Sequence, residues 1–211
     1  MKWRDLLTSL GREPVFSASL LQTGDVSRKE LSVQLSRWVT SGHLIQLRRG
    51  VYAIAKPYRK TEPHPFLVAN SLCRNSYVSL QSALAFHGLS PEYVPDCTSV
   101  STGRSEQLET PLGSFSYHRI RLDYLFGFGQ QEVAPNQLAF VAVAEKALLD
   151  LVYLTPGANT DSYLRELRLQ HTETLDGETL EKLADRMGKP KLRSAARLIR
   201  RLLADEEMNS T

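Results

Sequence analysis

Cysteine is scarce in this chain of 211 residues, which contains only Cys73 and Cys97. Their wide separation gives neither the close pairs of a structural metal site nor a disulfide framework. Long hydrophobic runs are also missing, and no apolar segment approaches the ~20 residues that a membrane-spanning helix needs. The charged start, with Lys2, Arg4 and Asp5, is not followed by the apolar core of a signal peptide. We therefore expect a cytoplasmic protein with free thiols, no metal site and no membrane contact.

Signatures of catalysis are equally sparse. The five histidines are dispersed and show no ligand or base spacing. The pair Gly127-Phe128-Gly129 lacks the rest of a dinucleotide or phosphate loop, and no serine lies in a nucleophile elbow. We expect no catalytic residue and no cofactor, and so not an enzyme, although catalytic groups distant in sequence can assemble in a fold.

Positive charge is concentrated at the N-terminus. Residues 1–60 contain 11 Lys or Arg and four Asp or Glu, a net charge of +7, whereas the remaining residues carry −4. A basic segment attached to a mildly acidic body predicts a polyanionic partner for that segment.

The first 55 residues follow the order helix, helix, helix, hairpin. The first helix is expected to end at Gly11, Ser17 to cap a short second one, and Gly24-Asp25 to form a tight turn. Ser27-Arg28-Lys29-Glu30 has the pattern of a capping box for a third helix that stops at Gly42. Two β-prone segments then flank Arg48-Arg49-Gly50. This order predicts a winged helix-turn-helix in residues 1–58 and double-stranded DNA as its partner.

The third helix has a polar face opposite its apolar stripe. Short hydroxyls permit close approach to base edges, cations reach guanine or phosphate, and a valine can meet a thymine methyl group. Arg28 lies nearer the buried side, at a helix N-terminus that favours phosphate. The wing arginines are expected to contact the DNA backbone or minor groove. The predicted DNA-binding residues are Arg28, Lys29, Ser32, Val33, Ser36, Arg37, Arg48 and Arg49. Alternatively, the helix face is merely solvated and the arginines lie at a soluble hairpin tip.

A proline-rich stretch separates this unit from the rest of the chain. We predict a linker at 59–65 and a mixed domain at 66–211. Helices are expected at 66–72, 79–86 and 142–154, strands at 97–102, 113–120 and 124–132, and helices near 161–170, 176–187 and 191–205. The fold class is therefore α+β: an N-terminal winged helix-turn-helix followed by a mixed α/β domain with a helical C-terminal tail.

The last of these helices is basic and amphipathic. Its candidate partner-binding cations are Lys191, Arg193, Arg197, Arg200 and Arg201. Such a surface suits an acidic protein or a nucleic acid, while the alternative is a terminal helix that simply packs on its neighbours.

Several segments together resemble a known family. The stretch 47–54 after a three-helix head resembles the wing of AbiEi-type antitoxins. The stretches 77–89 and 144–151, with the helical tail around 188–191, resemble that family's second domain. The resemblance extends over nearly the whole chain.

This resemblance implies a type IV toxin–antitoxin antitoxin. Its winged helix would repress its own promoter, and its second domain would counter a nucleotidyltransferase toxin. A transcriptional regulator whose second domain senses a ligand or partner is the alternative. On physical grounds we expect His87 to be a core or capping residue, and Glu145, Lys146 and Asp150 to form ion pairs or caps.

Overall fold

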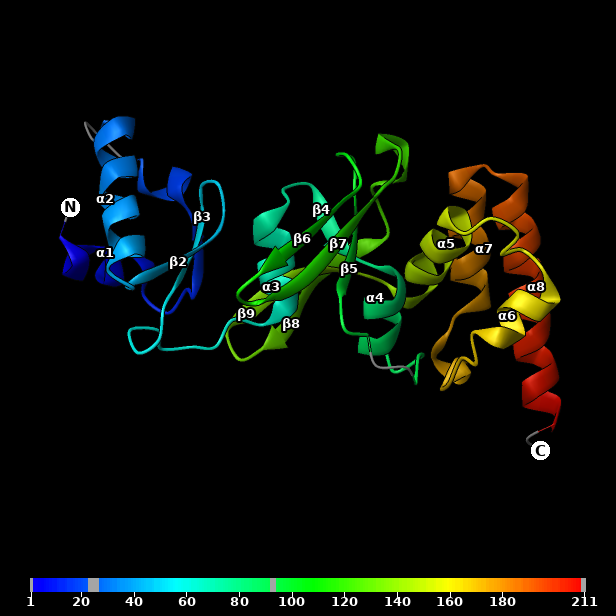
Figure 1. Cartoon of the computed structure of the whole chain (residues 1–211). Coiled ribbons are helices and arrows are strands. Elements are labelled where there is room, and N and C mark those ends of the chain that lie inside the picture. The colour runs from blue at the N-terminus through cyan, green and yellow to red at the C-terminus, as the bar shows by residue number, and fades with distance from the viewer. Residues whose placement is uncertain (1, 23–26, 92–93, 210–211) are drawn as a thin grey trace.

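A computed structural model describes residues 2–22, 27–91 and 94–209. The chain is a mixed α+β protein with two separate sheets (Figure 1). The strands of the first sheet lie within residues 15–54 and those of the second within residues 76–142. We call residues 2–58 the N-terminal unit and the rest the C-terminal body.

The N-terminal unit packs helices against a three-stranded antiparallel sheet of order β1-β3-β2. Its elements are α1 (Trp3–Leu10), β1 (Val15–Ser17), the 3-10 helix η1 (Ala18–Leu21), α2 (Arg28–Thr40), β2 (Leu44–Arg48) and β3 (Val51–Ile54). The predicted helix order and the hairpin are thereby confirmed, whereas the predicted turn at Gly24-Asp25 lies outside the described residues.

Two helix starts in this unit differ in how they are capped. Ser17 caps η1 by accepting a hydrogen bond from the Ser19 amide at 3.4 Å. Ser27 occupies the N-cap position of α2, but its side chain accepts no capping bond. The predicted capping box with Glu30 is therefore wrong in its hydrogen bonding, although it marks the correct start of the helix.

The C-terminal body is built on a six-stranded mixed sheet of order β6-β7-β5-β4-β9-β8. The β4–β9 and β5–β7 pairs are parallel and the others antiparallel. The strands are β4 (Ser76–Val78), β5 (Cys97–Ser101), β6 (Glu106–Thr110), β7 (Gly113–Arg119), β8 (Phe128–Ala134) and β9 (Gln137–Ala142). Three of them, β4, β6 and β9, were not predicted, and the expected strand at 124–132 begins later because residues 122–124 form a 3-10 helix.

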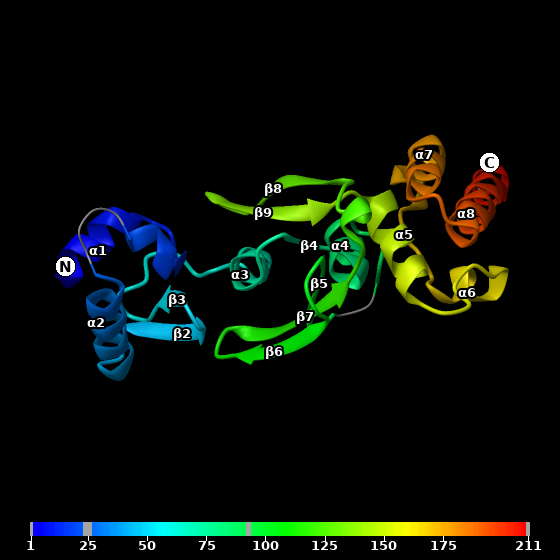
Figure 2. The same cartoon turned by 90° about the horizontal axis from the view of Figure 1, so that it is seen from above.

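Helix α3 (Pro65–Leu72) lies inside the curve of this sheet (Figure 2). Both arms of the sheet contact it. The Tyr117 hydroxyl on β7 donates to the Ala69 carbonyl at 2.7 Å, and the Phe140 amide on β9 donates to the Asn70 side chain at 2.6 Å. The helix is thus enclosed on two sides by strands that are far apart in sequence.

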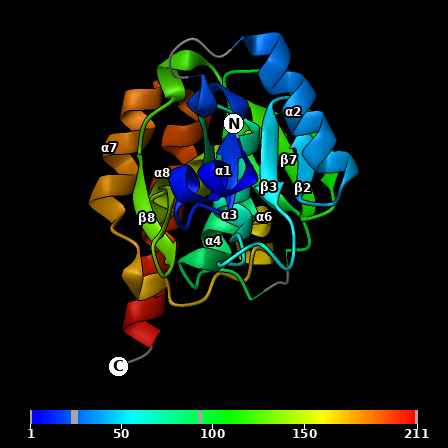
Figure 3. The same cartoon turned by 90° about the vertical axis from the view of Figure 1, so that its left-hand side faces the viewer.

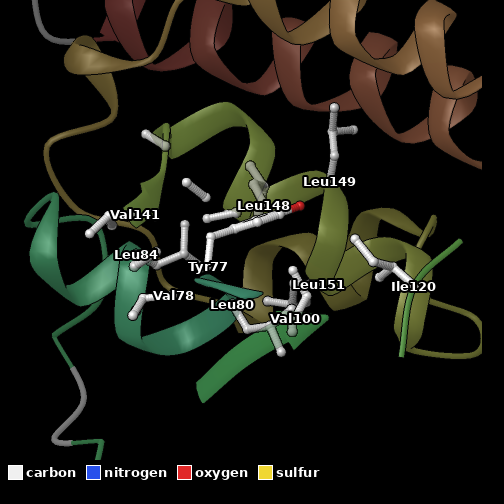
Figure 4. Close-up of a cluster of buried hydrophobic side chains, with 14 of the residues drawn as sticks. Tyr77, Val78, Leu80, Leu84, Val100, Ile120, Val141, Leu148, Leu149 and Leu151 are labelled. Atoms are coloured by element: carbon white, nitrogen blue, oxygen red, sulfur yellow. The ribbon is translucent and has the colours of Figure 1, made fainter. Parts of the chain in front are cut away.

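The opposite face of the sheet is covered by α4 (Leu80–Phe86) and α5 (Ala144–Leu154). Figure 4 shows Leu80 and Leu84 of α4 and Leu148 and Leu151 of α5 near residues of β4, β5 and β9, whereas Leu149 of α5 points toward the C-terminal helices. Burial of such side chains is the main source of stability, at about 1.5–3 kcal/mol each. Beyond α5 follow α6 (Asp161–Glu166), the 3-10 helix η3 (Thr172–Thr174), α7 (Gly177–Met187) and α8 (Pro190–Asn209).

The N-terminal unit is docked on α3 rather than held by the chain connection alone. Val15, Leu47 and Val51 belong to the same buried cluster as the core of the C-terminal body, whereas a second cluster lies within the N-terminal unit. The Arg74 guanidinium also donates to the Ser19 hydroxyl at 2.7 Å. The predicted linker contains no helix or strand before α3, yet the His64 amide donates to the Gln137 side chain at 2.8 Å.

Candidate nucleic-acid interface

Helix α2 has one buried and one exposed face. Leu31, Leu35 and Trp38 are buried against the N-terminal unit. In the view from the N-terminal end, α2 lies at the periphery of the molecule (Figure 3). The side chains of α2 that are predicted to contact DNA are all exposed: Arg28, Lys29, Ser32, Val33, Ser36 and Arg37.

These exposed side chains are available to a ligand. Arg28, Lys29 and Arg37 form no salt bridge with the part of the chain that the structure describes, and Ser32 and Ser36 use no side-chain hydroxyl in a hydrogen bond there. Val33 is 44% exposed, so its methyl groups are available for an apolar contact. The face therefore combines cations, hydroxyls and one apolar contact without competing internal partners.

The two predicted wing arginines, Arg48 and Arg49, are adjacent in the sequence but have different neighbours. Arg49 is exposed and has no ion-pair partner among the described residues. Arg48 instead donates through Nη1 to Glu106 Oε1 at 2.8 Å and through Nη2 to Glu106 Oε2 at 3.2 Å. Arg48 Nη1 also donates to the Leu72 carbonyl at 3.1 Å.

Arg48 thus has a structural role that the sequence did not reveal. Its bidentate pair joins β2 to β6, and its third bond joins β2 to the end of α3. A guanidinium occupied in this way would have to give up charge-assisted bonds before it could reach a phosphate. Arg48 therefore holds the N-terminal unit to the C-terminal body in this structure, while its predicted contact with DNA stays a prediction.

An aromatic cluster fixes the position of α2. The Trp3 ring packs edge-on against Trp38 at 5.2 Å, His43 at 4.9 Å and Tyr58 at 5.5 Å between centroids, and His43 stacks on Tyr58 at 4.6 Å. Such contacts add about 0.5–1.5 kcal/mol each to the burial. The cluster joins α1, α2, the start of the hairpin and the chain after β3, so it sets the angle at which α2 is presented. The spacing of these rings in the sequence gave no sign of it.

The basic C-terminal helix is mostly engaged within the protein. Arg193 pairs with Asp185 of α7 at 2.7 Å and Arg200 with Glu181 of α7 at 2.6 Å. Lys191 donates to the Thr155 carbonyl at 2.5 Å, and burial lowers the pKa of Lys191. These three predicted partner-binding cations have internal contacts.

Arg197 and Arg201 differ from the other cations of α8. Both are exposed and form no ion pair within the described ranges. They line an open groove of about 620 Å³ together with Arg193, Ser194 and Leu198. Of the predicted partner-binding cations of α8, only Arg197 and Arg201, one helical turn apart, therefore lack an ion pair or hydrogen bond within the described residues.

The charged residues of α5 form a buried structural network. Lys146 donates to Asp150 and, at 2.7 Å, to the Tyr77 hydroxyl, while the Tyr77 and Ser79 hydroxyls each donate to Asp150 at 2.9 Å. Burial lowers the pKa of Lys146 and raises that of Asp150, and the attraction between the two charges opposes both changes. The expected ion pair is confirmed, but Ser79 serves it instead of capping α4.

Two other residues of this region also have structural contacts. Glu145 accepts a hydrogen bond from the Asp176 amide at 2.9 Å, just before α7 begins. A ring nitrogen of His87 lies 2.8 Å from the Ala142 carbonyl, which ties the end of α4 to β9. The expectation that these side chains serve packing and capping is confirmed.

The described residues contain neither a metal-binding cluster nor a helix suited to a membrane. Over the described residues, no group of three His, Cys, Asp or Glu side chains is placed to hold a metal ion. None of the helices described combines the length and apolar character needed to cross a membrane. Comparison with protein-family models and with curated proteins gave no match.

Proposed function

We propose that the N-terminal unit is a winged helix-turn-helix that binds double-stranded DNA, and that the chain is a transcriptional regulator. In this proposal α2 is the recognition helix and the β2–β3 hairpin is the wing. The observation that carries it is the outer face of α2, where three cations and two hydroxyls are exposed and unpaired within the described residues.

The proposed contacts divide by chemistry. Arg37 and Ser36 would approach base edges, since they lie on the face opposite the buried stripe. Arg28 would bind phosphate at the helix start, where the amides and helix dipole favour an anion. Arg49 would bind phosphate from the wing, while Arg48 remains at the junction.

Titration of the full chain against DNA tests this proposal. A preferred site is selected from a random duplex pool, and affinity is measured at several salt concentrations. Each phosphate contact should contribute about −0.9 to the log–log salt slope. Arg37→Ala should cost about 1–3 kcal/mol on the preferred site and much less on random DNA. Arg49→Ala should weaken both equally.

The control variant for this titration is Arg104→Ala, which changes an exposed arginine of the C-terminal body. It should leave both affinities unchanged. A folded full chain that binds no duplex even at low salt would end the proposal.

A second candidate function rests on α8. The unpaired Arg197 and Arg201 support the antitoxin activity that the resemblance implies, in which this surface meets a nucleotidyltransferase toxin or the nucleic acid it uses. Coexpression with a toxin encoded beside this gene provides the assay. Reversing both charges should abolish growth rescue but leave DNA binding intact. Full rescue by that variant would remove α8 from the antitoxin surface.

A further inference from the structure

A cavity of about 540 Å³ lies at the end of α3 away from the N-terminal unit. It is formed by the start of α3, the end of α4, the residues before β5 and the start of β7. Its apolar lining is dominated by Phe66, Phe86, Leu112 and Phe115. Phe86 is 39% exposed, so an aromatic ring is partly presented to solvent at its edge. A cavity of this size suits a small molecule with an apolar ring.

The polar side chains that line the cavity indicate which charged group a ligand with such a ring would have. Asp96 is the one formally charged residue among the lining side chains that the structure describes. One of its carboxylate oxygens, Oδ2, accepts from Gln107 at 3.3 Å, and no hydrogen bond to a described residue engages the other. His64 Nδ1 accepts from the Phe66 amide at 3.2 Å and burial lowers the pKa of His64, so the ring is neutral at pH 7.

The remaining polar groups of the lining already have partners. The Ser82 hydroxyl donates to the Asp96 carbonyl at 3.2 Å and accepts from the Thr98 amide at 2.8 Å. The Ser114 hydroxyl donates to Glu109 at 2.7 Å. A carboxylate with an available oxygen and no opposing cation favours a positively charged ligand over an anion.

We propose that this cavity binds a small primary amine attached to an apolar ring, and that α3 transmits its occupancy to the N-terminal unit. The amine would pair with Asp96 and the ring would pack against Phe66 and Phe86. The transmission to DNA rests on the proposed function, but the binding site itself does not.

Helix α3 provides the connection. Its eight residues span about 12 Å. Pro65 and Phe66 at its start line the cavity, while the Leu72 carbonyl at its end accepts from Arg48. Val68, Ala69 and Leu72 share a buried cluster with residues of β1, β2 and β3. A ligand that displaces Phe66 moves a rigid rod whose other end contacts the hairpin next to α2.

Binding is tested with a matched pair of probes, 2-phenylethylamine and 3-phenylpropionate, on the isotope-labelled full chain by NMR. The amine should shift the amides of Phe66, Phe86 and Ser114 saturably, with at least about a tenfold lower Kd than the carboxylate. Asp96→Asn should remove that preference, and Phe86→Ala should weaken binding of the amine. Asp123→Asn, at an exposed site elsewhere, is the control and should change nothing.

Two results would overturn the site. One is the absence of saturable shifts at these amides with the amine. The other is an amine affinity that Asp96→Asn leaves unchanged in a folded protein.

Transmission is measured by tryptophan fluorescence, because both tryptophans, Trp3 and Trp38, lie in the N-terminal unit. The amine should change their emission along the same saturation curve as the NMR shifts. Arg48→Ala should keep the binding and lose the emission change. Binding with no emission change in the wild-type chain would overturn transmission. Failure of the ligand-free chain to bind any DNA would instead overturn the proposed function and leave the ligand site standing.

Discussion

Helices α2 and α8 are both amphipathic and rich in Lys and Arg, but their cations have different neighbours. The cations of α2 face solvent with no acidic partner in the described part of the chain. Those of α8 lie beside α7, whose Asp185 and Glu181 each take one arginine. The number of Lys and Arg residues in the sequence does not distinguish the two helices. Only the packing shows that the cations of α2 are open to a partner, whereas Arg193 and Arg200 of α8 are already paired with acids of α7.

The difference arises from where each helix packs. Helix α2 packs through its apolar stripe on the hydrophobic core and aromatic rings of the N-terminal unit. Helix α8 packs on another amphipathic helix, so its flanking cations meet that helix's flanking acids. Surface ion pairs of this kind contribute little stability, about 0–1 kcal/mol each, but they reduce the attraction of an outside anion.

The largest expected effect concerns the most deeply paired cation of the C-terminal body. Lys146→Met leaves the Asp150 carboxylate buried without its counter-ion and should cost about 3–5 kcal/mol of unfolding free energy. Urea denaturation measures this cost. Lys29→Met, at an exposed position of α2, is the matched control and should stay within about 0.5 kcal/mol of the wild type. A loss below that of typical surface variants would show that the Lys146–Asp150 pair is unimportant for folding.

The next effect compares two adjacent arginines of the hairpin. Arg48→Ala removes three hydrogen bonds at a half-exposed junction and should cost about 1–2 kcal/mol of stability. Arg49→Ala should leave stability unchanged and weaken DNA binding. A double-mutant cycle with Glu106→Ala separates the pair from its surroundings. Additive losses in that cycle would contradict the junction assigned to Arg48.

Local pattern predicted much of this fold. The hairpin at 44–54 and the helices α3, α5 and α7 follow from periodicity and from turn residues that the structure confirms. Strands β4, β6 and β9 were missed for physical reasons. β4 has three residues, β6 carries two glutamates on an edge strand, and β9 runs directly into the helical pattern of α5.

The candidate interface was predictable only in part. The exposed face of α2 follows from helical geometry, because one apolar stripe fixes the opposite side. The role of Arg48 depends on Glu106, 58 residues away, and the aromatic cluster on the meeting of four segments. The cavity beside α3 likewise joins four segments of the body. Contacts between distant segments leave no periodic signal in one sequence.

A smaller effect on stability is expected within α8, where two arginines form ion pairs and two do not. Arg193→Ala and Arg200→Ala each break an ion pair between helices and should cost about 0.2–1 kcal/mol. Arg197→Ala and Arg201→Ala should cost less, because neither forms an ion pair in the described ranges and Arg201 has only a longer-range attraction to Asp161. Thermal denaturation of the four variants gives the comparison, with salt reducing only the first two losses. Equal losses in all four would mean that the ion pairs contribute no stability.

The smallest expected effect is a pH dependence that arises from two partly buried histidines, His64 and His118. Burial lowers the pKa of both His64 and His118, so the unfolded chain takes up protons first as pH falls below about 6.5. Stability should therefore be full above that value and decline below it, down to the lowered native pKa values. His64→Asn keeps a capping oxygen for α3 without titrating and should reduce the slope measured by urea denaturation between about pH 7.5 and 5.5, above the carboxylate range. His118→Asn should remove a further part. If the double variant keeps the full slope, the acid sensitivity originates in other groups, and protonation of His64 does not weaken the first turn of α3.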